Sequence, residues 1–128
     1  MVLLKINQQA NWLCINQYQI MSRAKKVDRN QPEIVQLFRD LGASVAITSS
    51  AGDGFPDIVV QFRNPARRNY NIETVLVEIK DGELSPSRRK LTPDQETFHS
   101  KFYCEIVKDR ADVFRVMGMS DPDGAEAT

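Results

Sequence analysis

Apolar positions in the first half of the chain follow a helical spacing and then an extended one. From Asn30 they recur three and four residues apart, which predicts a helix whose apolar face is formed by Ile34, Leu37, Phe38 and Leu41. Pro32 suits the first turn of this helix, and Gly42 is placed to end it. Ser, Gly and Asp residues then mark a flexible loop over residues 49–54.

Three β-branched and apolar runs surround this loop and are typical of strands. They cover residues 43–48, 58–62 and 74–80. The connection over residues 63–71 is basic and contains Asn-Pro and Asn-Tyr-Asn, which is typical of a long hairpin loop. The pattern therefore predicts three consecutive strands after the first helix.

The last third of the chain predicts two helices with a strand between them. Thr92-Pro93-Asp94-Gln95 has the form of a capping box with proline at the first helical position, so a helix should start there. Residues 105–107 can form a fourth strand, and Arg110 to Met117 a short closing helix. The predicted order is helix, three strands, helix, strand, helix, which is an α/β arrangement.

Length and charge allow one soluble domain with local basic clusters. The chain has 128 residues, and its 17 basic and 17 acidic residues give no net charge, so no global field attracts polyanions. Basic clusters can still form a rim that binds phosphates. The residues predicted to contact DNA phosphates are Lys25, Lys26, Arg67, Arg68, Arg88, Arg89 and Lys90.

We divide the chain into an N-terminal extension (residues 1–22), a main domain (23–119) and an acidic tail expected to be disordered (120–128). The first twenty residues carry a single charge and are rich in Asn and Gln. Either Met21 is the natural start and they are an upstream extension, or they form a strand or arm that packs on a partner. No run reaches the length of a membrane span, and two distant cysteines are typical of reduced thiols, so we expect a cytoplasmic protein.

Charged residues gather at the ends of two predicted strands. Asp57 opens the second strand, and Glu78 and Lys80 lie two residues apart at the end of the third, so these two side chains point the same way. A cation held by Asp57, Glu78 and the backbone carbonyl of Ile79 would have only oxygen ligands, which suits Mg²⁺ or Mn²⁺ and not zinc. Lys80 could orient a water or neutralise developing charge, so the set predicts phosphodiester hydrolysis.

Each candidate also has a purely structural interpretation. Glu33 and Gln95 complete the candidate set, yet each lies three residues after an N-cap position and can close a capping box. Asp57 follows a proline and can be a turn residue. Glu78 and Lys80 alone would more often be a solvated cross-strand salt bridge.

Four motifs, in this order, resemble those of the VRR-NUC (virus-type replication-repair nuclease) branch of the PD-(D/E)XK nuclease superfamily. They are Glu33, Gly54-Phe55-Pro56-Asp57, Glu78-Ile79-Lys80 and Leu91-Thr92-Pro93-Asp94-Gln95. The resemblance implies a restriction-endonuclease-like αβββαβα core with a mixed central sheet flanked by helices. It also implies that Asp57 and Glu78 hold the metal, that Glu33 assists directly or through a water, that Lys80 is the catalytic lysine, and that Gln95 positions the water or the lysine.

Small stand-alone members of this family are viral or bacterial, form homodimers and cut branched DNA, including four-way (Holliday) junctions. The resemblance thus implies a Mg²⁺- or Mn²⁺-dependent endodeoxyribonuclease of a bacterial cell or a phage-infected host. A two-fold dimer would hold two sites at a fixed separation, as paired cuts on a junction require. The alternatives are a flap or restriction-type nuclease, or an inactive DNA-binding or assembly module on a nuclease fold.

Overall fold

The computed structural model describes residues 27–68 and 71–124. The helices are α2 (Gln31–Asp40), α3 (Pro93–Lys101) and α4 (Arg110–Met117). The strands are β1 (Ser44–Ile47), β2 (Ile58–Arg63), β3 (Ile72–Ile79) and β4 (Cys104–Val107). Two short 3-10 helices, η1 (Ser49–Ala51) and η2 (Pro86–Arg88), lie in the connections. The predictions for residues 1–22, for Lys25 and Lys26, and for the last four residues of the tail lie outside the described ranges.

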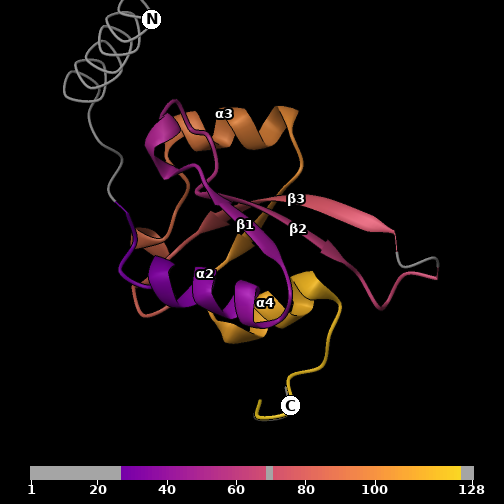
Figure 1. Cartoon of the computed structure of the whole chain (residues 1–128). Coiled ribbons are helices and arrows are strands. Elements are labelled where there is room, and N and C mark those ends of the chain that lie inside the picture. Colours follow the sequence, from indigo (N-terminus) through magenta and orange to yellow (C-terminus); the bar gives the residue numbers. More distant parts are fainter. Residues whose placement is uncertain (1–26, 69–70, 125–128) are drawn as a thin grey trace, which may run out of the picture.

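The order of elements along the chain confirms the predicted α/β arrangement. The four strands form one mixed sheet in the order β1-β2-β3-β4, with antiparallel β1–β2 and β2–β3 pairs and a parallel β3–β4 pair (Figure 1). Because Ile58 lies opposite Val77, the start of β2 adjoins the end of β3. The antiparallel register therefore brings together the two strand ends that carry the candidate charges.

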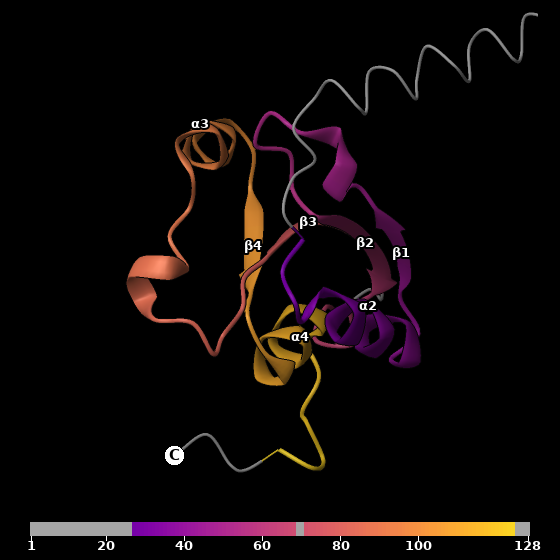
Figure 2. The ribbon, with the colours of Figure 1, turned by 90° about the vertical axis from the view of Figure 1, so that its left-hand side faces the viewer.

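Helices α2 and α4 pack on one face of the sheet, and α3 lies on the other (Figures 1 and 2). The core lies between the sheet and the α2–α4 pair, because alternate strand residues point there. The predicted apolar face of α2 is largely confirmed, since Ile34 and Phe38 are buried and Leu37 and Leu41 pack against the core. The other core residues include Val35, Ile58, Val60, Phe62, Val77, Ile79, Val107, Val113 and Met117.

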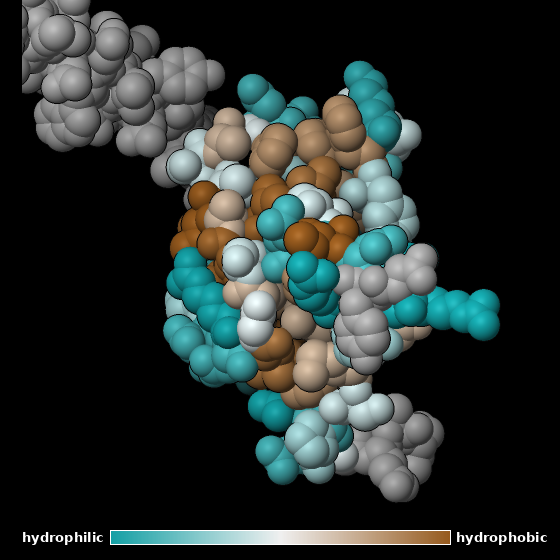
Figure 3. Space-filling model, turned by 45° about the vertical axis from the view of Figure 1, so that its right-hand side comes forward, coloured by the Kyte–Doolittle hydropathy of each residue, from teal (hydrophilic) through white to brown (hydrophobic). Residues whose placement is uncertain are grey.

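The sheet face turned toward α3 is less completely covered. Val59, Leu76 and Cys104 on this face are only half-buried, and Ile106 is exposed. Figure 3 shows hydrophobic surface below α3, beside hydrophilic side chains. Among the residues of α3, Gln95 is the one that is buried. The attachment of α3 therefore depends strongly on its first turn.

The acidic tail begins against the body of the domain. Arg110 donates to both carboxylate oxygens of Asp121, over 2.7 Å from Nε and 3.0 Å from Nη2. The hydrogen bond from Arg110 lowers the pKa of Asp121. None of the helices within residues 27–68 and 71–124 combines the length and the apolar content that a membrane span needs.

Candidate active site

Asp57 lies directly before β2 and is 2% exposed. Its Oδ2 accepts a hydrogen bond of 2.7 Å from the backbone N–H of Ile79, and its backbone carbonyl accepts one of 2.8 Å from Thr48. The first bond attaches the carboxylate to the end of β3, across the β2–β3 pair. Asp57 is therefore an interior residue whose carboxylate is held within the fold, and its position directly before β2 is compatible with the turn interpretation.

The loop that carries Asp57 is held against the first turn of α3. Gly54 has a φ of 78°, and a Cβ placed there would lie 2.2 Å from the carbonyl oxygen of Asp94 and 2.8 Å from the nitrogen of Gln95. Beside this contact, the rings of Phe55 and Phe98 meet edge to face with their centroids 5.2 Å apart. Only glycine allows so close an approach, so the loop and the helix form one unit.

Glu78 and Lys80 form a buried pair that Gln95 bridges. Gln95 Nε2 donates to Glu78 Oε1 over 2.6 Å, and Lys80 Nζ donates to Gln95 Oε1 over 2.9 Å. The lysine nitrogen lies 3.8 Å from Glu78 Oε1, and the side chains of Lys80 and Glu78 are 12% and 1% exposed. The prediction that both point the same way is confirmed. The interpretation as a solvated cross-strand salt bridge is wrong, because both residues belong to one strand end and lie in the interior.

Gln95 also closes the capping box that the sequence predicts. Thr92 Oγ1 accepts a hydrogen bond of 3.3 Å from the backbone N–H of Gln95, and Gln95 Oε1 accepts one of 2.9 Å from the backbone N–H of Thr92. The same oxygen accepts from Lys80, which joins the helix start to the charged pair. The structural and functional interpretations of Gln95 are therefore compatible.

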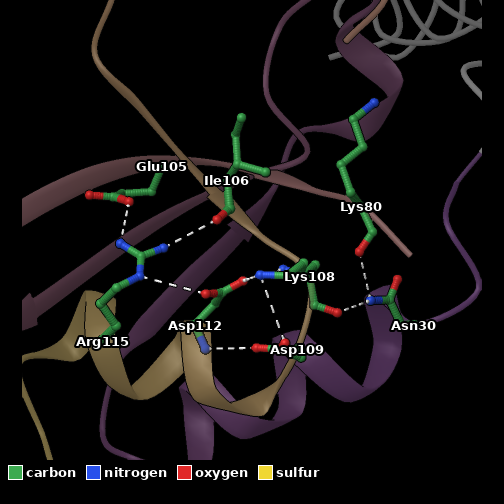
Figure 4. A network of polar contacts seen from close by, with 8 residues as sticks. All are labelled: Asn30, Lys80, Glu105, Ile106, Lys108, Asp109, Asp112 and Arg115. Carbon is green, nitrogen blue, oxygen red and sulfur yellow. Dashed lines mark hydrogen bonds and ion pairs between the residues drawn. The ribbon is translucent and has the colours of Figure 1, made fainter. Parts of the chain in front are cut away.

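Asn30 fixes the strand end from the opposite side of the sheet. Its Nδ2 donates to the carbonyl oxygen of Lys80 over 2.9 Å and to that of Lys108 over 3.1 Å (Figure 4). Figure 4 shows the Lys80 side chain extending away from this carbonyl, so the backbone is held on one side while the amine reaches the other. No sequence pattern signals this role, because an asparagine before a helix predicts an N-cap.

Glu33 lies apart from this group. The N-cap residue Asn30 makes no side-chain capping bond, so the predicted capping box at Glu33 is not formed. Glu33 is exposed and lines a groove of about 950 Å³ between α2, the residues after β3 and the start of α4. Asp57, Glu78 and Gln95, by contrast, are buried and do not line this groove. The role of Glu33 at a metal stays a prediction.

The basic residues fall into two groups. Arg88, Arg89 and Lys90 lie in the connection that leads from β3 to α3, close in sequence to Gln95. Arg67 and Arg68 lie in the loop between β2 and β3, at the other end of those strands. The 6 residues of β2 separate them from Asp57, a distance of about 20 Å at roughly 3.3 Å per residue. Arg67 and Arg68 therefore lie at the end of β2 that is remote from Asp57.

Arg67 also forms an ion pair within the chain. Its Nε lies 2.7 Å from Glu73 Oε1 at the base of the hairpin. Binding of a phosphate by Arg67 would have to compete with this pair, which is largely exposed on the arginine side and therefore weak. The DNA contacts of both groups stay predictions.

The donors at the start of β2 and the end of β3 suit a hard cation. Two buried carboxylates, Asp57 and Glu78, lie beside the single ammonium group of Lys80, and a divalent cation would reduce the cost of burying both negative charges. The bond from the N–H of Ile79 uses one of about four acceptor positions of the Asp57 carboxylate, so it is compatible with coordination. No set of three His, Cys, Asp or Glu side chains with metal-binding geometry occurs in the described part of the chain. Carbonyl oxygens and waters would have to complete the shell.

The charge of Glu78 also acts on the neighbouring strand. Cys104, a free cysteine, lies opposite Leu76 at the start of β4. Burial, together with the negative charge of Glu78, raises the pKa of its thiol.

Comparison with known proteins assigns no family to the chain. No protein-family model matches it, and neither a curated protein nor a solved structure matches it. The assignment of a function therefore depends on the chemistry of the site.

Proposed function

We propose that the chain is a Mg²⁺- or Mn²⁺-dependent endonuclease that hydrolyses phosphodiester bonds in branched DNA. The observation that carries the proposal is the Glu78–Gln95–Lys80 bridge beside the buried carboxylate of Asp57. Burying two carboxylates and an amine where the start of β2 adjoins the end of β3 is costly for stability, and such groups are concentrated at functional sites. The resemblance to the VRR-NUC nucleases, which rests on these same residues, supports the proposal.

In the proposed mechanism, Asp57, Glu78 and the carbonyl oxygen of Ile79 would hold the metal ion. When bound, the ion supplies polarisation of a phosphoryl oxygen and a water of lowered pKa. Gln95 holds the amine of Lys80 at 2.9 Å, which fixes its orientation before substrate arrives. From that position Lys80 orients the attacking water or neutralises charge that develops on the phosphoryl group.

The fold supports the proposal without identifying a family. The αβββαβα order and the mixed β1-β2-β3-β4 sheet are compatible with a restriction-endonuclease-like core. In that core, the site would lie where the start of β2 adjoins the end of β3. The pairing of Ile58 with Val77, the sequence neighbours of Asp57 and Glu78, supports this proposal.

The placement of the basic residues supports a substrate with more than one arm. Arg88, Arg89 and Lys90 would contact phosphates near the scissile bond. Arg67 and Arg68, about 20 Å along β2 at roughly 3.3 Å per residue, would contact phosphates of a different helical segment. The expected homodimer would double both contacts and set the distance between paired cuts. Charge-reversal of either group should weaken binding and reduce its dependence on salt.

The test is cleavage of labelled single-stranded, duplex, flap and four-way DNA in Mg²⁺, Mn²⁺ or EDTA. Asp57→Asn keeps the acceptor for the N–H of Ile79 but removes the charge, and Lys80→Met removes the amine at similar length. We expect each to reduce cleavage by about 10²-fold or more. Gln36→Leu, on the exposed side of α2, should cleave like the wild type.

Two outcomes would contradict the mechanism. Cutting that persists in EDTA would exclude a metal-dependent mechanism. Full activity of both variants would exclude Asp57 and Lys80 from catalysis. Tight binding of four-way DNA without cleavage by the wild type would instead favour the DNA-binding module.

A further inference from the structure

Gln31, at the start of α2, carries a buried polar atom that the fold does not use. The residue is 5% exposed, and its Nε2 donates to Ser49 Oγ over 3.3 Å. Its Oε1 is buried and accepts no hydrogen bond from any described residue. A buried amide oxygen without a donor is unfavourable for stability, and about nine in ten such groups have a partner. The presence of glutamine there, in place of an apolar residue, needs a reason.

Gln31 is connected to both strands that carry the site. Its neighbour Asn30 is hydrogen-bonded to the carbonyl of Lys80 at the end of β3. Its contact Ser49 follows directly on the residue whose N–H donates to the carbonyl of Asp57 over 2.8 Å. The amide therefore lies at the end of the sheet where Asp57 and Lys80 meet.

We propose that Gln31 is a positioning residue for the metal shell, and that its Oε1 accepts a hydrogen bond from a water bound to the cation held by Asp57 and Glu78. This inference rests on the proposed function. Mg²⁺ keeps several of its waters when proteins bind it, and neutral oxygens are suitable partners for them. Since the described residues offer no third carboxylate in metal-binding geometry, a neutral carbonyl is the donor that α2 can add.

Gln31 and Glu33 leave α2 in different directions. Successive residues of an α-helix are about 100° apart, so these two side chains leave α2 about 200° apart. Gln31 is buried against η1, whereas Glu33 is exposed and lines the groove on the other flank. Gln31 therefore takes the contribution from the first helix that the resemblance implies for Glu33.

Two substitutions separate a metal-shell role from a structural one. Gln31→Leu removes the unpartnered oxygen together with the hydrogen bond to Ser49 Oγ, so stability in EDTA, measured by urea unfolding, should stay close to that of the wild type. In calorimetric titration with Mn²⁺ alone, it should weaken binding about tenfold, the lower range for outer-shell partners of a metal. Gln31→Glu should lower stability in EDTA and tighten Mn²⁺ binding.

Controls on the same helix and in the same site make the result decisive. Gln36 is exposed and donates to Asp40 over 2.8 Å, so Gln36→Leu should leave Mn²⁺ binding unchanged. The inference is overturned if Gln31→Leu binds Mn²⁺ as the wild type does, or if Gln31→Glu binds it no more tightly. In that case, loss of Mn²⁺ binding by Asp57→Asn would leave the proposed function intact. A wild type that does not bind Mn²⁺ would instead refute the metal site and the inference together.

Discussion

Gly54 is the point at which the loop that carries Asp57 meets the helix that carries Gln95, so Gly54→Ala tests whether this contact builds the site. The φ of 78° is in the left-handed region, where a side chain costs about 1–2 kcal/mol. The new Cβ would also lie 2.2 Å from the carbonyl oxygen of Asp94, a distance that must increase to at least 3.0 Å. The opposing atoms are backbone, so the loop and the helix have to separate.

That separation acts on the hydrogen bonds of Gln95, which are 2.6 Å to Glu78 and 2.9 Å from Lys80. A hydrogen bond to a charged group contributes about 1.5–3 kcal/mol. Together with the backbone strain, we expect Gly54→Ala to lower the free energy of unfolding by about 3–5 kcal/mol. Displacing catalytic groups by about 1 Å should reduce cleavage by about 10²-fold.

Gly52 provides the matched control, because it has a φ of 73° in the same loop but no atom within 4 Å of the position that a Cβ would occupy. In Gly52→Ala, backbone strain alone should lower the free energy of unfolding, by about 1–3 kcal/mol, and cleavage should be retained. Urea unfolding followed by circular dichroism, and cleavage of four-way DNA in Mn²⁺, measure the two effects. Equal losses in the two variants, or normal cleavage by folded Gly54→Ala, would refute the reasoning.

Four further substitutions test the supporting contacts. Gln95→Leu should lower the free energy of unfolding by about 3–5 kcal/mol, because it leaves a buried charged pair without its bridge. Thr92→Ala removes only the cap and should lower it by about 1 kcal/mol. Equal losses in the two variants would show that the bridge contributes nothing to stability. Asn30→Ala should cost about 1–3 kcal/mol for its two hydrogen bonds, and a change near zero in urea unfolding would contradict this. The pKa of Glu105 is lowered, because burial, which raises it, is outweighed by hydrogen bonds that include one from Arg115. The stability that Glu105 contributes is present above its unfolded pKa of about 4.3, and it is lost as the pH falls through the lower pKa of the folded state. Glu105→Gln should therefore flatten the acid side of the plot of unfolding free energy against pH. An unchanged plot would exclude this contribution.

Local patterns were sufficient to predict the elements. The spacing of apolar residues and the positions of Pro32 and Gly42 predicted α2, and the Thr92–Gln95 capping box predicted the start of α3. These signals act within one or two turns of chain, which is why they can be read without the fold. The predicted start of β3, at residue 74, was less accurate. Its first residue, Ile72, pairs with Arg63 across the hairpin, and this pairing is not a local property.

The sequence by itself determined which residues have the chemistry of a site, and strand alternation put Glu78 and Lys80 on one side. Only the tertiary structure decided that Glu78 is buried, that Gln95 bridges it to Lys80, and that Glu33 faces away into a groove. It also revealed the buried amide oxygen of Gln31, a residue whose place in the sequence resembles that of any helix start. The reason is physical: burial and hydrogen-bond partners depend on the register of strands and the packing of helices, which join residues far apart in the chain.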